Sequence, residues 1–434
     1  MRVKHLYESE ITMREKLKSL FRDGFFHILG SSFVNKCIAF LTNIVLMRIM
    51  SKSDFGVFTG AFNAFYIIFL FSGLGITSGM LYFCSRDIGK EEKASYYRYS
   101  FRFGLMTEIF LSAALVVYGA VGYVGIEETR KYIIMLAGMP FVTFVYDYYA
   151  IVLRAEKSNI KYSKYLNINT VLYLVLGCAG AAVGGIAGTI IGRYLAYILT
   201  CVVGNRYCKD ILDVKDADPL TRSQIKDLSR YSMKSGVTSA LNTILYRLDV
   251  LIIGYVVVDS SILASYKAGT QLPENLNFIP QCVMIYFLPL LIQNISNTEW
   301  IKKKVKQIYL MVGAVSLAIG LFVIVAAPLI VKILWGDKYI DAVPCMRILS
   351  VSFIVLSTFR ITSTNILLAL KRTGFTMAVS IVTGVSNIIL DVVLTMKFGS
   401  IGAAYATLIV TVIAALMSFP YVIYIVYSGK CSYE

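Results

Sequence analysis

Apolar residues gather along the chain into twelve long runs that are separated by short polar stretches. The runs cover residues 24–49, 55–82, 101–124, 132–153, 165–185, 187–205, 231–258, 261–292, 308–334, 345–370, 374–396 and 400–428. An α-helix needs about 20 apolar residues to cross the hydrocarbon core of a bilayer, and most of the runs reach this length. The fifth and sixth runs nearly merge at Gly184 and Gly185, where we expect a tight turn. The pattern predicts an all-α polytopic membrane protein with about twelve transmembrane helices.

The composition supports this prediction and excludes other classes of protein. Of the 434 residues, 57% are hydrophobic and 16% are charged, whereas soluble domains average about 45–50% and about 25%. The mean hydropathy is +0.69. The sequence has no GxxxxGK[ST] motif, no paired cysteine spacing and only two isolated histidines. We therefore expect no ATPase activity, no catalytic residues, no enzyme and no metal cofactor.

Polar segments divide the chain into parts. Residues 1–23 mix acidic and basic residues without an apolar core, which predicts a cytoplasmic amphipathic segment rather than a signal peptide. The longest internal polar stretch, 206–230, predicts a cytoplasmic linker. It would separate an N-lobe of six helices at 24–205 from a C-lobe of six helices at 231–428, which a cytoplasmic tail at 429–434 follows.

The chain is basic as well as apolar, with 42 Lys plus Arg against 26 Asp plus Glu and a formal net charge of +16. The basic residues concentrate in alternate loops, and such loops face the cytoplasm. This asymmetry predicts that both termini are cytoplasmic. Most of the positive charge then sets orientation in the membrane, so it gives no reason to expect a nucleic-acid partner.

The two predicted lobes resemble each other. Residues 151–153 lie before a charged pair at 156–157, and residues 366–368 lie before a charged pair at 371–372. The offset that takes Ile151 to Ile366 also takes Gly184 to Gly399. We interpret this as a duplicated six-helix unit with a pseudo-two-fold axis along the membrane normal.

Charged residues inside the apolar runs are candidates for function, because a charge at mid-bilayer costs roughly 2.5–3.5 kcal/mol on the insertion scale. The basic candidates away from the ends of the runs are Lys36, Arg193, Arg247, Lys267 and Arg360, and the acidic candidates are Glu108, Asp147, Asp249, Glu274 and Asp391.

Lys36, Arg247 and Arg360 lie near the middles of their runs, whereas Arg193 and Lys267 could snorkel outwards. A cavity lined by such cations would bind an anion such as pyrophosphate. Ion pairs between helices are the alternative explanation.

The acidic set offers candidates for ion coupling. Asp249 and Glu274 are the best candidates to bind a coupling Na⁺ or H⁺, and the alternative is that they only offset neighbouring cations. Tyr146, Tyr148 and Tyr246 adjoin charged residues and are candidates to contact sugars. An aromatic belt at the membrane interface would explain them equally well.

Several segments resemble a known family. The stretch Arg48–Phe58, RIMSKSDFGVF, resembles the R-x-L-S-x-x-D-F-G-x-Y junction of bacterial polysaccharide-biosynthesis flippases. Residues 73–76, 248–254 and 399–407 are similar to further motifs of that family. The resemblance implies the O-antigen flippase (Wzx-like) branch of the MATE-like multidrug/oligosaccharidyl-lipid/polysaccharide exporter superfamily. Its members form two six-helix lobes in a V around a central cavity.

The resemblance also implies a function. Such proteins move undecaprenyl-pyrophosphate-linked oligosaccharide, the repeat unit of O-antigen, capsule or exopolysaccharide, across the bacterial inner membrane by alternating access. On that pattern Lys36, Arg247, Lys267 and Arg360 would hold the pyrophosphate or acidic sugars. The expected partners are lipid-linked oligosaccharide, membrane lipid, a polysaccharide polymerase and a chain-length regulator, and we expect a monomer.

Two other functions are compatible with a membrane protein of this kind. A MATE-type cation-coupled antiporter of drugs or metabolites is the main alternative, although the first apolar run lacks the carboxylate that drug exporters often use. A membrane enzyme such as a polymerase or glycosyltransferase would need a large outer loop or a DxD site on the outer side. Every predicted outer loop is short, and the DxD run at residues 216–218 falls in the predicted cytoplasmic linker.

Overall fold

The computed structural model describes residues 25–214, 218–295 and 297–429; within these ranges the side chains of 25–29, 32, 241–248, 251, 285, 289 and 373 are outside the description. The predicted N-terminal segment 1–23, part of the linker and nearly all of the tail also lie outside the described residues. The described parts of the chain are helices joined by short turns, without a strand. This confirms the all-α prediction.

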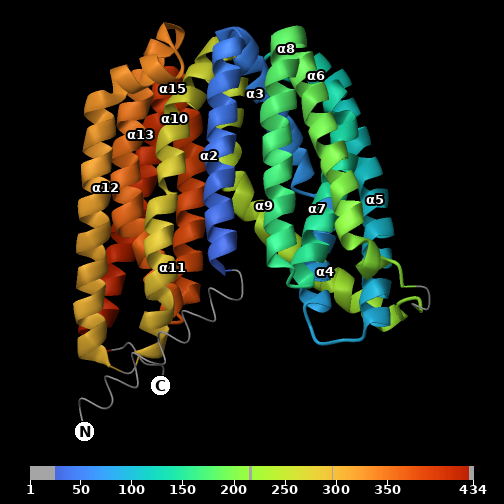
Figure 1. Cartoon of the computed structure of the whole chain (residues 1–434). Helices are drawn as coiled ribbons and strands as arrows, with labels where there is room; N and C mark the ends of the chain where they lie inside the picture. Colours follow the sequence, from blue (N-terminus) through green and yellow to red (C-terminus); the bar gives the residue numbers. More distant parts are fainter. Residues whose placement is uncertain (1–24, 215–217, 296, 430–434) are drawn as a thin grey trace. The chain divides into compact units, whose positions relative to one another are not determined.

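The helices follow the predicted runs closely (Figure 1). The first half of the chain contains α2 (Phe25–Ile49), α3 (Lys52–Phe69), η1 (Ser72–Gly75), α4 (Ile76–Cys84), α5 (Lys90–Val121), α6 (Thr129–Met135), η2 (Leu136–Gly138), α7 (Met139–Ala155) and α8 (Asn159–Leu212). The second half contains α9 (Arg222–Val256), α10 (Ser260–Leu276), α11 (Phe278–Gln293), α12 (Thr298–Leu334), η3 (Asp337–Ala342), α13 (Val343–Val355), η4 (Leu356–Ile361), α14 (Thr362–Ala369) and α15 (Thr373–Tyr427).

These helices account for the twelve predicted spans. Among the described residues, seven helices are long and apolar enough to cross a membrane, and the number is eight if α3 and η1–α4, which meet at a bend of 41°, count as one span. Two of the seven, α8 and α15, have 54 and 55 residues and break at Gly185 and Gly399, so each supplies two spans. With 25 and 35 residues, α2 and α9 also exceed the roughly 20 residues of one crossing.

The break in α8 is the tight turn that the sequence predicts. Gly185 has φ 55° and ψ −132°, a conformation that an L-residue with a side chain rarely adopts. The backbones on its two sides are so close that a Cβ on Gly188 would lie 2.0 Å from the carbonyl oxygen of Gly180. The chain therefore reverses direction here as a helical hairpin.

The structure divides into two compact units. Of the described residues, unit 1 comprises those within 25–50, 64–123 and 128–244, and unit 2 comprises those within 51–63, 124–127 and 245–429. In unit 1, buried side chains of α4, α5, α7 and α8 form an aromatic-rich core around Phe144 and Tyr165. In unit 2, α11, α12, α14 and α15 enclose an aliphatic core. Each unit thus has its own hydrophobic interior.

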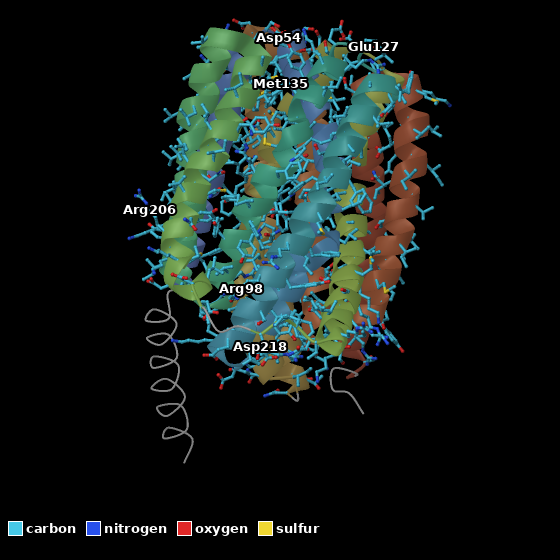
Figure 2. The ribbon with its side chains drawn as sticks, turned by 90° about the vertical axis from the view of Figure 1, so that its right-hand side faces the viewer. Asp54, Arg98, Glu127, Met135, Arg206 and Asp218 are labelled. Atoms are coloured by element: carbon cyan, nitrogen blue, oxygen red, sulfur yellow. The ribbon has the colours of Figure 1, made fainter. Side chains whose placement is uncertain are left out.

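Part of the predicted linker packs against unit 1. The Arg98 guanidinium donates to the carbonyl oxygen of Val214, and the Ser95 hydroxyl donates to that of Asp218. Arg98 and Asp218 lie close to the same end of this unit, far from Met135 (Figure 2). These contacts hold the start of α5 to Val214 and Asp218, two positions within the linker.

The offset in residue number that relates the two halves is one smaller in the structure than the sequence suggests. Lys157 and Lys371 adopt left-handed conformations, with φ 54° and 56°, just beyond the ends of α7 and α14. Gly185 and Gly399, with φ 55° and 60°, break α8 and α15. The two pairs have the same separation along the chain. Gly399 therefore corresponds to Gly185 rather than to Gly184, because Gly185 is the left-handed residue of the first hairpin.

Candidate functional site

An acidic site lies inside unit 2, where three helices meet. One carboxylate oxygen of Asp249, on α9, accepts hydrogen bonds from the Tyr266 hydroxyl of α10 at 2.9 Å and the Thr407 hydroxyl of α15 at 3.0 Å. Tyr266 is only 1% exposed. Neutral hydroxyl groups therefore hold Asp249, and no basic side chain forms an ion pair with it among the described residues.

A second carboxylate, Asp391 of α15, lies beside this group. Asp391 is 0% exposed, and its charged neighbour is Asp249. Asn387 precedes it by one helical turn and is also buried. Neither oxygen of Asp391 makes a hydrogen bond of good geometry within the described part of the chain. The site therefore brings together two carboxylates, hydroxyl groups and an amide.

This combination has a definite electrostatic consequence. Asp391 is fully buried and Asp249 is half-buried. Neighbouring carboxylates in such a place repel each other strongly, so they share a proton unless a cation compensates them. Carboxylate, hydroxyl and amide oxygens are the ligands that hard cations prefer. The arrangement is thus suited to bind and release a small cation or a proton.

The other predicted coupling residue, Glu274, has a different partner. Its carboxylate lies 3.1 Å from the Lys267 ammonium, two turns earlier on α10, and its side chain is 57% exposed. The Glu274–Lys267 pair matches the alternative explanation from the sequence, in which a carboxylate only offsets a neighbouring cation. Lys267, a predicted substrate-binding residue, accordingly shares its charge with Glu274.

Two predicted substrate-binding cations have no such partner. Arg360 is half-buried in η4, a π-helical turn within an otherwise α-helical span, and π-turns are frequent at functional sites. Lys36 is exposed on α2. Neither forms a hydrogen bond or ion pair with any residue that the structure describes. Arg247 and Tyr246 are within α9, but their side chains lie outside the described residues.

Unit 1 contains a basic residue of another kind. The Arg193 guanidinium, on α8, lies 4.2 Å from the ring centre of Tyr173 and 4.4 Å from that of Tyr197. It also donates a 2.7 Å hydrogen bond to the Tyr197 hydroxyl. Asp147 of α7 interacts with it electrostatically. Arg193 is thus compensated within its own unit.

The candidate sugar-contacting tyrosines of α7 pack in this region. Tyr146 stacks on Tyr165 at 5.1 Å and meets the Tyr197 ring edge-on at 5.1 Å. Tyr148 is 4% exposed and packs against Phe101 at 4.9 Å. Tyr146 therefore borders the Arg193 cluster, while Tyr148 belongs to the core.

Glu108 stabilises the break between α3 and α4 through hydrogen bonds. Its buried Oε1 accepts hydrogen bonds from the Ser72 hydroxyl at 2.7 Å and the Gly73 amide at 3.0 Å. Gly73, Leu74 and Gly75 all have positive φ values, so the right-handed helix is interrupted at these residues. The carboxylate supplies the acceptor for the Gly73 amide at this interruption.

Comparison with known proteins agrees with this architecture. Residues 45–344, well over half of the chain, match the family described as "Polysaccharide biosynthesis protein". The chain belongs to this polysaccharide biosynthesis family. The resemblance stated from the sequence is thereby confirmed. No curated relative matches the chain.

Several solved structures share the fold of this family member. The lipid II flippase MurJ in an inward closed conformation has a TM-score of 0.70 at 15% identity, over 93% of this chain and 87% of the other. An inward-facing MATE family multidrug resistance transporter of the MOP superfamily has 0.71 at 15% identity, over 92% and 96%. A MOP superfamily transporter from Pyrococcus furiosus has 0.58 at 14% identity, over 93% and 94%. The protein is a multi-pass membrane protein with a MATE-like fold, and its structural neighbours are flippases and transporters rather than enzymes.

The ion-coupling residues chosen from the sequence do not include every residue of the acidic site. The pattern of charges favours Asp249 and Glu274, whereas the structure places Asp249 beside Asp391. One signal was available: Asn387 and Asp391 are one helical turn apart, so they share one helix face within an apolar run. Thr407 ends the last motif that resembles the family, but hydropathy gives no reason to place it near Asp249.

Proposed function

We propose that this protein is a flippase that moves undecaprenyl-pyrophosphate-linked oligosaccharide across the bacterial inner membrane by alternating access. Membership in the polysaccharide biosynthesis family carries the proposal, because the family match coincides with a multi-pass fold. The fold is also that of a lipid II flippase. The substrate would be anionic through its pyrophosphate and would remain anchored in the membrane by its lipid.

Unpaired cations at span depth support an anionic substrate. Arg360 and Lys36 are charged, lie in apolar helices and have no partner among the described residues, so they are free to bind phosphate oxygens. Arg360 is the stronger candidate because its guanidinium can hold a phosphate group with two parallel hydrogen bonds. Arg247 would join them from the first helix of the second lobe. Lys267 would contribute less, since Glu274 already neutralises it.

The acidic site of unit 2 supports coupling to a cation gradient. The carboxylates of Asp249 and Asp391, with the Thr407 hydroxyl and the Asn387 amide, would hold Na⁺ or H⁺. The bound cation would supply the positive charge that these carboxylates lack. The chain's own residues would translate its binding into movement, because Asp249 connects α9 with α10 and α15 through the hydrogen bonds of Tyr266 and Thr407. We further propose cytoplasmic termini, a monomeric protein, and functional coupling to a polysaccharide polymerase and a chain-length regulator.

Complementation of a flippase-null strain tests the proposed function. Expression of this chain should restore surface polysaccharide in the strain that supplies its repeat unit. Arg360→Ala should reduce export at least tenfold at equal protein level in the membrane. Arg347→Ala is the matched control and should export normally. This exposed arginine lies on the preceding helix and, among the described residues, donates to the carbonyl oxygen of Ile324 alone.

Two results would contradict the proposal. Normal export by Arg360→Ala would refute the assignment of the anion site. Failure of the wild-type chain to restore any polysaccharide, together with resistance to cationic dyes, would favour the drug antiporter over the flippase.

A further inference from the structure

When the left-handed glycines Gly185 and Gly399 are aligned, the hairpins of α8 and α15 correspond residue for residue. A Cβ on Gly188 would lie 2.0 Å from the Gly180 carbonyl oxygen, and a Cβ on Gly402 would lie 2.0 Å from that of Leu394. In that register Gly188 corresponds to Gly402, and Gly180 corresponds to Leu394. The backbone packing of the hairpins therefore independently supports the alignment of the two units.

This register relates the acidic site of unit 2 to the Arg193 cluster of unit 1. Asn387 corresponds to Tyr173, and Thr407 corresponds to Arg193. In unit 2 these positions help to surround a carboxylate pair that lacks a cation among the described residues. In unit 1 they supply a guanidinium and one of the rings that hold it.

The surroundings of Arg193 are those of a bound cation. Two aromatic faces, from Tyr173 and Tyr197, flank the guanidinium, and such faces attract cations. Tyr66 of α3 adds a third hydroxyl group within electrostatic range, and Asp147 of α7 is the carboxylate that interacts with it. No basic residue other than Arg193 interacts with Asp147 in the described part of the chain.

We propose that Arg193 is a tethered cation. It permanently occupies, in unit 1, the position that corresponds to the cation-binding site of unit 2. Unit 1 then needs no exchangeable ion, and its aromatic slot is specific for a planar guanidinium. It also follows that only unit 2 responds to ions, and this consequence rests on the ion coupling proposed above.

Removal of the side chain tests the slot directly. Arg193→Ala would leave Asp147 uncompensated and the faces of the Tyr173 and Tyr197 rings without their cation, and free guanidinium would fit the gap. We expect the purified full-length variant in detergent to have a Tm several degrees below the wild type. Guanidinium chloride at millimolar concentration, far below the molar range in which it denatures proteins, should recover at least half of that deficit. NaCl and KCl at equal ionic strength should recover little.

Matched variants separate this effect from general stabilisation. Arg206→Ala removes an exposed arginine from the same helix and should show no response to guanidinium. Asp147→Asn in the Arg193→Ala background should weaken the rescue, because it removes the uncompensated carboxylate. Equal rescue by Na⁺, or none by any cation in a folded Arg193→Ala protein, would overturn the proposal.

If Arg193→Ala does not fold, the order of two milder variants decides. Arg193→Lys keeps the positive charge and Arg193→Gln does not, so a tethered cation requires the lysine variant to be the more stable. The reverse order would overturn the proposal.

The unit 2 site is tested separately by a Na⁺-dependent rise in Tm that Asp391→Asn removes. Its absence would refute coupling to Na⁺ and leave the guanidinium rescue of unit 1 unaffected.

Discussion

Individual charges inside the spans are accommodated in four different ways. Lys267 is neutralised by Glu274, Arg193 lies between two tyrosine rings, and Glu108 binds a backbone amide and a hydroxyl group. Asp391 is fully buried beside a second carboxylate, Asp249, and neither of its oxygens makes a hydrogen bond of good geometry within the described part of the chain. A charge that its own unit compensates has a structural explanation. The uncompensated ones, Asp391 and Arg360, are therefore the better candidates for binding an ion or a substrate.

Glu108 allows a direct test of the structural role. Glu108→Ala would leave the Ser72 hydroxyl and the Gly73 amide without an acceptor, and each buried unsatisfied group costs about 1–3 kcal/mol. We expect a clear fall in Tm in detergent. Glu108→Gln keeps a carbonyl oxygen as acceptor and should lose much less. Glu299→Ala is the control, because its exposed pairing with Lys302 contributes little. Equal stability of Glu108→Ala and Glu299→Ala would contradict the role.

At the scale of elements, the two helical hairpins depend on glycine for two distinct reasons. Gly399 adopts φ 60° and ψ −139°, but a Cβ there would meet no atom within 4 Å. Gly402 has ordinary helical geometry, but its Cβ would lie 2.0 Å from a backbone oxygen. The first glycine is needed for its backbone conformation and the second for close packing.

This distinction predicts unequal effects of alanine. Gly399→Ala should lose about 1–3 kcal/mol, the cost of a backbone conformation that only glycine adopts readily. Gly402→Ala should lose more, because the two arms of the hairpin must move apart. Gly374→Ala, which has neither constraint, is the control and should match the wild type. Thermal unfolding in detergent ranks the three variants, and a Gly402→Ala protein as stable as the control would show that the hairpin is not tightly packed.

The sequence predicts elements better than it predicts their partners. Hydropathy locates the spans because each must bury about 20 residues in lipid, and the motif at Arg48–Phe58 indicates the family. Neither signal shows the π-turn around Arg360 or the break at residues 73–75, which depend on neighbouring helices. For the same reason Asp249 can be selected as an intramembrane acid, but its proximity to Asp391, on a distant segment of the chain, cannot.

At the scale of the whole molecule, the net charge of +16 has two meanings. Most basic residues lie in polar segments between spans, where they would set orientation. The few inside spans differ between the units: unit 1 supplies Arg193 as its own cation, whereas unit 2 leaves two carboxylates to be compensated. If transport responds to an ion gradient, the response should therefore arise in unit 2.

The gradient dependence of flipping is the measurement that tests this asymmetry. Moving one positive charge across 100 mV is worth about 2.3 kcal/mol, which corresponds to roughly a 50-fold bias at 1.36 kcal/mol per tenfold. In proteoliposomes with an imposed Na⁺ or H⁺ gradient, the wild type should flip lipid-linked oligosaccharide faster than without a gradient. Asp249→Asn and Asp391→Asn should each abolish that difference. Each variant replaces one of the two repelling carboxylates with a neutral amide, so a cation is no longer needed to offset the repulsion. Asp337→Asn, in an exposed pair with Lys332, should retain it. A full gradient response in both site variants would place coupling elsewhere in the chain, and loss of the response in Asp337→Asn as well would show that the effect is not specific to the site.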